Sequence, residues 1–218
     1  MRNIGLLFLI LSLFSQCKTK EKDFSSLNND LYNIINSYTE AVNKESESPL
    51  VVVVFERTIP LTQSILEKRG GIPNPPGSLY SENIYDVNFE ILQKREILNE
   101  EDVAFMKTQL IPIDVPYNER FFYLLDSAYV SLPIMTEMEY EEMFSISKDA
   151  YNRWNEFRSK YDGCYIAFSN PIFNENKSKV YFQATEMCGR LYGHGEIVVM
   201  ERNNGGWKII YWEETWVS

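Results

Sequence analysis

Three acid–base side chains stand close together near the C-terminus, namely Glu186, His194 and Glu196. His194 is the single histidine of the 218 residues, so a serine–histidine–acid hydrolase would need it as the general base. Glu186 falls on the apolar side of an alternating stretch, where burial would raise its pKa and suit it to general acid chemistry. These three residues are therefore the candidate catalytic set.

Each candidate also has a structural explanation. Gly193 and Gly195 flank His194, which is typical of a tight turn. Glu186 could stand at a strand end, where its carboxylate reaches water past the sheet edge. The chain contains no Gly-x-Ser-x-Gly nucleophile motif and no glycine fingerprint for phosphates or dinucleotides. We therefore expect a binding or structural module of unknown specific activity, with a periplasmic hydrolase that uses Glu186 and His194 as the alternative.

Metal binding is poorly supported by the residue spacings. His194 with Cys164 and Cys188 could at most form a Cys2His set, whose spacing does not match known zinc sites. The acidic segment 137–142 lacks the loop spacing of calcium sites and is better explained as the solvated face of a helix. We expect no metal and no cofactor.

The two cysteines depend on how their strands pair. In an antiparallel hairpin, the apolar residues of both strands share one face when the numbers of the paired residues have an even sum, and 352 is the sum taken here. That register places Ile166 opposite Glu186 and Cys164 opposite Cys188. A disulfide is one outcome in an exported protein, and two small buried thiols are the other.

The C-terminal third predicts a meander of four strands. Alternating apolar residues, with the turn Asn203-Asn204-Gly205-Gly206 before the last segment, predict strands at Cys164–Ser169, Lys179–Cys188, Glu196–Glu201 and Trp207–Trp212. A helix over Lys148–Lys160 carries aromatic residues on one side and should cover one face of this sheet. The predicted fold class is α+β, with an antiparallel sheet of about four strands packed against helices.

The N-terminal half contains further elements. The apolar spacing predicts a helix over residues 27–43, a strand buried on both faces at Leu50–Phe55, an irregular loop at 70–77 and a helix capped by Asn99 that precedes Pro112. The loop is a possible boundary within one α+β domain that covers residues 24–218.

Aromatic residues offer a possible ligand surface. Tyr192, Trp207 and Trp212 could contact a sugar or another apolar ring. On a regular strand, however, Trp207 and Tyr211 share one face while Trp212 and Trp216 take the other. That division favours core packing on one side and helix contact on the other.

The N-terminus has the composition of an export signal. Arg2 provides positive charge, and the apolar run Ile4–Phe14 is too short to span a bilayer. Leu13-Phe14-Ser15-Gln16-Cys17 then resembles the lipobox of bacterial lipoproteins. The resemblance implies a signal peptide over 1–16, palmitate-type lipidation of Cys17 and a polar tether over 17–23, and hence attachment to a membrane.

The charge and composition of the chain limit the classes of molecule it can bind. A formal net charge of −10 repels phosphate backbones, so nucleic-acid binding is not expected. Hydrophobic residues at 44% and aromatic residues at 14% are sufficient for a folded core. A protein or a saccharide remains as the partner class.

The segment from Met187 to Gly195, together with Gly206-Trp207-Lys208 and the ending Trp216-Val217-Ser218, resembles the C-terminus of uncharacterised lipoproteins of Bacteroidetes-type bacteria. The resemblance implies a lipid-anchored protein of a Gram-negative cell envelope, at the outer membrane or facing the periplasm, and carries no activity. Asp126-Ser127-Ala128 resembles the short O-glycosylation acceptor of such bacteria, with Ser127 as the modified residue.

Overall fold

The computed structural model describes residues 25–45, 51–61, 89–112, 115, 121–144, 149–189, 192–204 and 206–217. The chain divides into two compact units, Met1–Asp30 and Leu31–Ser218. Of the first unit only residues 25–30 are described, so the fold is that of the second unit. The predicted signal peptide, Cys17, the tether and the loop at 70–77 lie outside the described residues.

The described elements, in chain order, are α2 (Ser25–Glu45), β1 (Val51–Phe55), α4 (Phe89–Lys94), α5 (Glu100–Lys107), β2 (Ile134–Met135), α6 (Glu137–Met143), α7 (Ala150–Lys160), β3 (Cys164–Phe168), β4 (Ile172–Phe173), β5 (Lys179–Gly189), β6 (Tyr192–Asn203) and β7 (Gly206–Val217). None of the helices in these ranges combines the length and the apolar character needed to cross a membrane.

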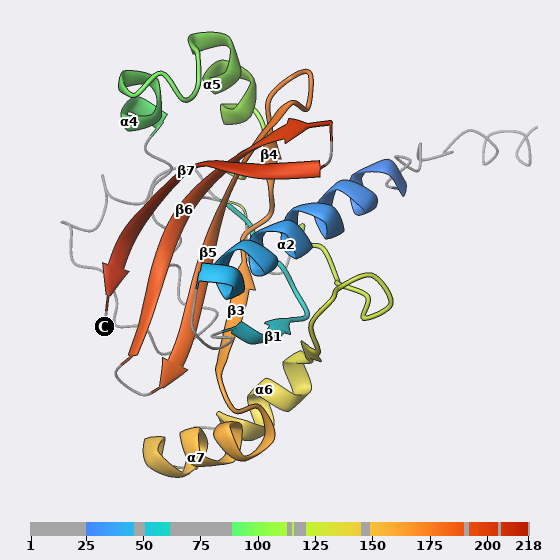
Figure 1. Cartoon of the computed structure of the whole chain (residues 1–218), viewed down its shortest axis with the longest axis vertical. Coiled ribbons are helices and arrows are strands. Elements are labelled where there is room, and N and C mark those ends of the chain that lie inside the picture. Colours follow the sequence, from blue (N-terminus) through green and yellow to red (C-terminus); the bar gives the residue numbers. More distant parts are fainter. Residues whose placement is uncertain are drawn as a thin grey trace, which may run out of the picture. The chain divides into compact units, whose positions relative to one another are not determined.

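The strands form one mostly antiparallel sheet, which confirms the α+β class (Figure 1). Its order is β2-β1-β3-β5-β6-β7, and β4 also pairs with β5. The expected meander is present as β3, β5, β6 and β7, but the predicted count of about four strands is too low, because the sheet has seven. Strand β1 joins the meander in parallel with β3, and β2 in parallel with β1.

The β3–β5 pair has the register predicted from the sequence. Ile166 lies opposite Glu186, and Phe168 lies opposite Ala184. Because side chains alternate along a strand, the even-numbered residues of β3 and β5 share one face of the sheet. This register carries the two cysteines toward each other.

Strand β1 is buried as the uninterrupted valine run predicts. Val51, Val53 and Val54 have no exposed surface. Its neighbours β2 and β3 pair with it on either side. A strand in this position lies in the interior of the sheet, which explains the absence of polar alternation.

Helix α2 covers the face of the sheet that carries Phe168 and Phe182, which we call the α2 face. The ring of Tyr38 makes edge contacts with both phenylalanines, with ring centroids 5.6 and 5.5 Å apart. Tyr38 belongs to the predicted apolar stripe of the helix, and the neighbouring Ile34 and Ile35 are also 1% exposed. Burial of this stripe fixes α2 on the sheet.

The opposite face of the sheet is covered by the other helices. One cluster joins residues of α4 and α5 to Tyr181, Val199 and Tyr211. A second cluster joins α6 and α7 to Tyr165 and Ala167. These two helix pairs lie at opposite ends of the sheet (Figure 1). The sheet is thus sandwiched, and side chains of the α2 face see a different environment from those behind them.

Two acidic segments are helix starts. Asn99 caps α5, with its side chain accepting from the backbone of Asp102. Thr136 caps α6 in the same way, with Glu139 as its partner. The hydrogen bond of Asn99 confirms the predicted cap. The acids of each first turn are favoured by the helix dipole. The segment at 137–142 is helical, as expected for it.

Candidate functional site: a buried acid–base cluster beside a disulfide

The pairing of β5 with β6 gathers the three candidate acid–base residues. Glu186 lies directly opposite His194, and Ala184 lies opposite Glu196. Because this register continues the α2 face across both strands, the three side chains point to the same side of the sheet. The sequence-based prediction groups these residues together, and the register explains their proximity.

His194 is a strand residue. The glycine-flanked segment is expected from the sequence to form a turn before a strand at Glu196, but β6 already begins at Tyr192. The glycines have a packing role instead, because a Cβ at Gly195 would overlap the indole ring of Trp216. Gly195 therefore allows the indole of Trp216 to approach the backbone of β6 closely, on the face opposite His194.

His194 and Glu196 form the central pair of the cluster. The Nε2 of His194 lies 2.6 Å from Oε1 of Glu196, and the side chains are 19% and 6% exposed. The hydrogen bond to Glu196 raises the pKa of His194 above its ordinary value of 6.5, and this outweighs the lowering by burial. The pair therefore favours a positively charged imidazole beside a carboxylate.

The second oxygen of Glu196 faces helix α2. It accepts a hydrogen bond from the hydroxyl of Tyr38, which lies 158 residues away in sequence. Burial alone would raise the pKa of Glu196, but hydrogen bonds from His194, Tyr38 and Trp212 hold it below its ordinary value. Glu196 is therefore an ionised group under a helix, stabilised by donors from three elements.

Glu186 differs from Glu196 in its partners. Its side chain is 3% exposed, so the alternative in which it reaches water at a strand end is wrong. Burial raises the pKa of Glu186 most strongly, Glu196 raises it further, and His194 opposes the shift. The two carboxyl groups near one imidazole are therefore shifted in opposite directions, with the pKa of Glu196 lowered and the pKa of Glu186 raised.

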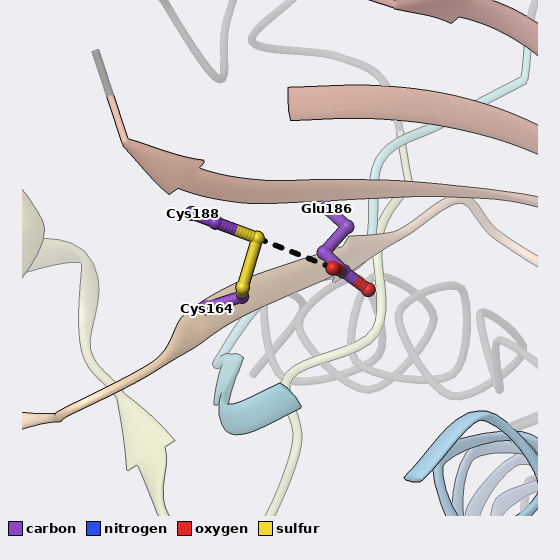
Figure 2. Close-up of side chains that lie close together, drawn as sticks. All are labelled: Cys164, Glu186 and Cys188. Carbon is purple, nitrogen blue, oxygen red and sulfur yellow. Dashed lines mark hydrogen bonds between the residues drawn. A yellow bond between two sulfur atoms is a disulfide. The ribbon is translucent and has the colours of Figure 1, made fainter. Parts of the chain in front are cut away.

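Cys164 and Cys188 are joined by a disulfide, with their Cα atoms 4.1 Å apart. Oε1 of Glu186 lies 3.2 Å from Sγ of Cys188, as Figure 2 shows. A disulfide sulfur carries no hydrogen, so a hydrogen bond across this distance requires the proton to sit on the carboxyl group of Glu186. The contact and the burial of Glu186 favour the same neutral form.

These three side chains also have the spacing of a metal site. Among the described residues, Cys164, Glu186 and Cys188 each place one potential ligand atom within 4.8 Å of the other two. Thiolates bind metals, whereas the bonded sulfurs of a disulfide offer no such charge. In the disulfide state this group is therefore unsuited to holding a zinc ion.

The candidate aromatic surface is divided differently from the prediction. Trp212 and Tyr192 are 52% and 57% exposed, but Trp207 is 7% exposed and packs beside Phe173. Trp207 is therefore a core residue, in line with the favoured interpretation of core packing, and it is not part of an exposed ligand surface. Tyr192 and Trp212 remain candidates.

Two register shifts between β6 and β7 cause this difference. An extra β7 residue is inserted where Val199–Tyr211 pairing passes to Met200–Ile209, and again where Glu196–Glu214 passes to Gly195–Trp216. Each insertion moves the following side chains to the other face. Trp207 and Tyr211 therefore occupy different faces, as do Trp212 and Trp216, and the predicted sharing of faces is wrong.

Ser127 stands in an exposed turn, where the amide of Ala128 donates to the side chain of Asp126. This position is compatible with modification, and glycosylation of Ser127 stays a prediction. The lipidation site Cys17 stays a prediction as well.

Tyr38 is the member of the cluster that reasoning from the sequence missed. The sequence pattern places it only in an apolar helix stripe. A signal was present, because a buried tyrosine usually needs a hydrogen-bond partner for its hydroxyl. The partner is separated from it by most of the chain, and no local pattern identifies it.

Comparison of the chain with protein-family models, with curated proteins and with solved structures found no match.

Proposed function

We propose that this chain is an exported, lipid-anchored protein of the cell envelope that acts by binding a partner. The observation that carries the proposal is the disulfide between Cys164 and Cys188. Disulfides persist in oxidising compartments such as the bacterial periplasm and are rare in the cytosol. The N-terminal segment that resembles a lipoprotein signal, with Cys17 at its lipobox, leads to the same compartment.

The acid–base cluster supports a structural role within such a binding protein. Both oxygens of Glu196 are engaged, one by His194 and one by Tyr38. Glu186 and Glu196 are 3% and 5% exposed. The cluster thereby fastens helix α2 to the last antiparallel strands, which supports a rigid scaffold.

We propose that exposed residues of β6 and β7 form the contact surface. Tyr192, Trp212 and Val217 are more than half exposed, and Val217 and Trp212 pair with His194 and Val198 of β6. Tyr192, Val217 and Trp212 therefore lie in a row on the α2 face. The row spans about 20 Å, because Tyr192 and the partner of Trp212, Val198, are six residues apart on β6. Large exposed aromatic side chains next to polar groups are typical of surfaces that bind proteins or saccharides.

Export and anchoring are tested by blocking lipoprotein processing. Globomycin treatment of expressing cells should cause the precursor to accumulate, and Cys17→Ser should remove lipid labelling. Cys164→Ser serves as the matched control, because it changes another cysteine and should leave lipid labelling intact. A Cys17→Ser variant that still incorporates labelled palmitate would contradict the anchor.

Partner binding is tested by placing a photo-crosslinking residue at Trp212 in the native host. Met138, which is 75% exposed on α6, is the control position. We expect an adduct from position 212 that is absent from position 138. A protein adduct shifts the mass by kilodaltons, whereas a saccharide adduct is removed by glycan-degrading enzymes. Equal yields at both positions would oppose a binding surface on β6 and β7.

The second candidate is a periplasmic hydrolase that uses Glu186 and His194. It is favoured by one observation, namely that a carboxylate-paired imidazole lies directly opposite a protonatable carboxyl group. Purified protein should then cleave an ester or glycoside substrate, with loss of activity in both Glu186→Gln and His194→Gln. Turnover that survives both substitutions would remove this candidate.

A further inference from the structure

The two cysteines of the disulfide differ in their exposure to solvent. Cys164 is 3% exposed, whereas Cys188, one residue before the end of β5, is half-buried. Thiol–disulfide exchange begins with attack of a thiolate on one sulfur, and access helps to decide which sulfur is attacked. Because Cys188 is the more exposed of the two residues, we take its Sγ as the point of attack, with Cys164 as the leaving group.

The buried carboxyl group lies against the same bond. Figure 2 shows the carboxyl group of Glu186 beside the disulfide. Its Oε1 lies 3.2 Å from Sγ of Cys188, and a carboxyl oxygen of Glu186 also lies within 4.8 Å of Sγ of Cys164. A leaving thiolate in a buried position is unfavourable unless a proton reaches it. Glu186 is the acid whose oxygen touches the bond.

We propose that Cys164–Cys188 is a redox-active disulfide that exchanges with dithiols, and that Glu186 is the catalytic residue that supplies and recovers the proton. The ligand class is a dithiol, either a small molecule or a cysteine pair of a reducing protein. This activity goes beyond the proposed binding function and does not depend on it.

The first half-reaction breaks the protein disulfide. One thiolate of the dithiol attacks Sγ of Cys188 and forms a mixed disulfide. The bond between the two cysteine sulfurs breaks, and its electron pair moves to Sγ of Cys164. The carboxyl group of Glu186 gives its proton to that sulfur and becomes a carboxylate.

The second half-reaction releases the reductant. The carboxylate of Glu186 takes the proton of the remaining thiol of the dithiol, whose sulfur attacks its neighbour in the mixed disulfide. The sulfur of Cys188 leaves as a thiolate and takes from water the proton that the dithiol lost at the start. The dithiol is oxidised to a disulfide by two electrons, and the protein is reduced to two thiols.

The surroundings of Glu186 control when it holds a proton. Tyr38 faces it from α2, and His194 and Glu196 face it from β6. Ionisation of Glu186 is opposed by the charge of Glu196 and favoured by the charge of His194. On the side of Cys188, the guanidinium of Arg158 from α7 lies 3.5 Å from its carbonyl oxygen.

The test measures reduction of the full-length oxidised protein by dithiothreitol between pH 4 and pH 9. Samples are quenched with acid and alkylated, and the number of alkylated thiols is determined by intact mass. Each rate constant is divided by the concentration of dithiothreitol thiolate at that pH. For the native protein we expect this rate constant to fall as pH rises, through one inflection above the ordinary glutamate value of 4.5. Glu186→Gln should remove that inflection and slow reduction at pH 5 by at least about tenfold.

Glu201→Gln, an exposed substitution on β6, is the matched control and should retain the native profile. A structural role of Glu186 would change the unfolding midpoint without removing the inflection. If Glu186→Gln does not fold, the native profile decides alone, because a profile without an inflection overturns the proton transfer. A disulfide in the folded protein that resists 10 mM dithiothreitol for hours overturns the activity itself.

Discussion

The hydrogen bond from Tyr38 to Glu196 gives the sharpest prediction of stability. Tyr38→Phe removes the donor, while the remaining ring keeps its contacts with Phe168 and Phe182. The bond joins residues that are 1% and 5% exposed, so water is poorly placed to replace the hydroxyl. A hydrogen bond to a charged group contributes about 1.5–3 kcal/mol. Because Glu196 retains His194 as a donor, we expect Tyr38→Phe to lower the free energy of unfolding by about 2 kcal/mol.

Urea unfolding followed by tryptophan fluorescence measures this change. Tyr32→Phe on the same helix is the matched control, because the hydroxyl of Tyr32 accepts a neutral backbone N–H, that of Asp126, at 3.1 Å. A neutral bond of this kind contributes about 1 kcal/mol. In a Glu196→Gln background the cost of Tyr38→Phe should also fall to about 1 kcal/mol. Equal losses for Tyr38→Phe and Tyr32→Phe, or an undiminished loss in the Glu196→Gln background, would refute the role of the charged bond.

Three further predictions concern His194, Gly195 and Asn99. The raised pKa of His194 means that its contribution is fully present below pH 6.5 and is lost as pH rises through the raised value. The free energy of unfolding should therefore decrease above pH 6.5 with a slope of at most about 1.4 kcal/mol per pH unit. His194→Gln should remove this pH dependence. Gly195→Ala places a Cβ in the space of the Trp216 indole and should lower the free energy of unfolding in urea by about 1–3 kcal/mol. Trp216→Ala should relieve most of this cost, and a cost that persists in full in the double variant would exclude the clash. Asn99→Ala should cost about 1 kcal/mol and Asn99→Asp much less, whereas equal effects would argue against the cap.

The β3–β5 register was predictable because two local constraints agree there. The hairpin requires paired positions, and the apolar residues of both strands must share one face. Ile166 opposite Glu186 satisfies both requirements. Helix α2 and the cap at Asn99 were predictable for a similar reason, since apolar spacing and capping residues act within one or two turns.

The positions of the tryptophans were not predictable from alternation. Two register shifts insert single residues into β7, and neither insertion is marked by a glycine or a proline at the bulged position. The parallel addition of β1 to the sheet was equally hidden, because β1 and β3 pair across more than a hundred residues of chain. Tyr38 joined the cluster for the same reason, since tertiary packing alone brings α2 over Glu196.

His194 illustrates how glycine can be misinterpreted in a sequence. Flanking glycines are typical of a turn, yet here they lie within β6. Gly195 is needed because the indole of Trp216 occupies the space of a side chain, and Gly193 likewise lies against Met187. Close approach and a turn leave the same mark in the sequence, and only the tertiary structure separates them.

The redox state of the cysteines in the cell envelope tests both the proposed location and the exchange chemistry. Membranes from the native host are alkylated without reductant, and the chain is then measured by intact mass. The structure predicts no alkylation of Cys164 or Cys188 until a reductant is added, and two alkylated cysteines afterwards. Full alkylation of both residues before reduction would contradict the disulfide, and with it the export and the exchange chemistry that rest on it.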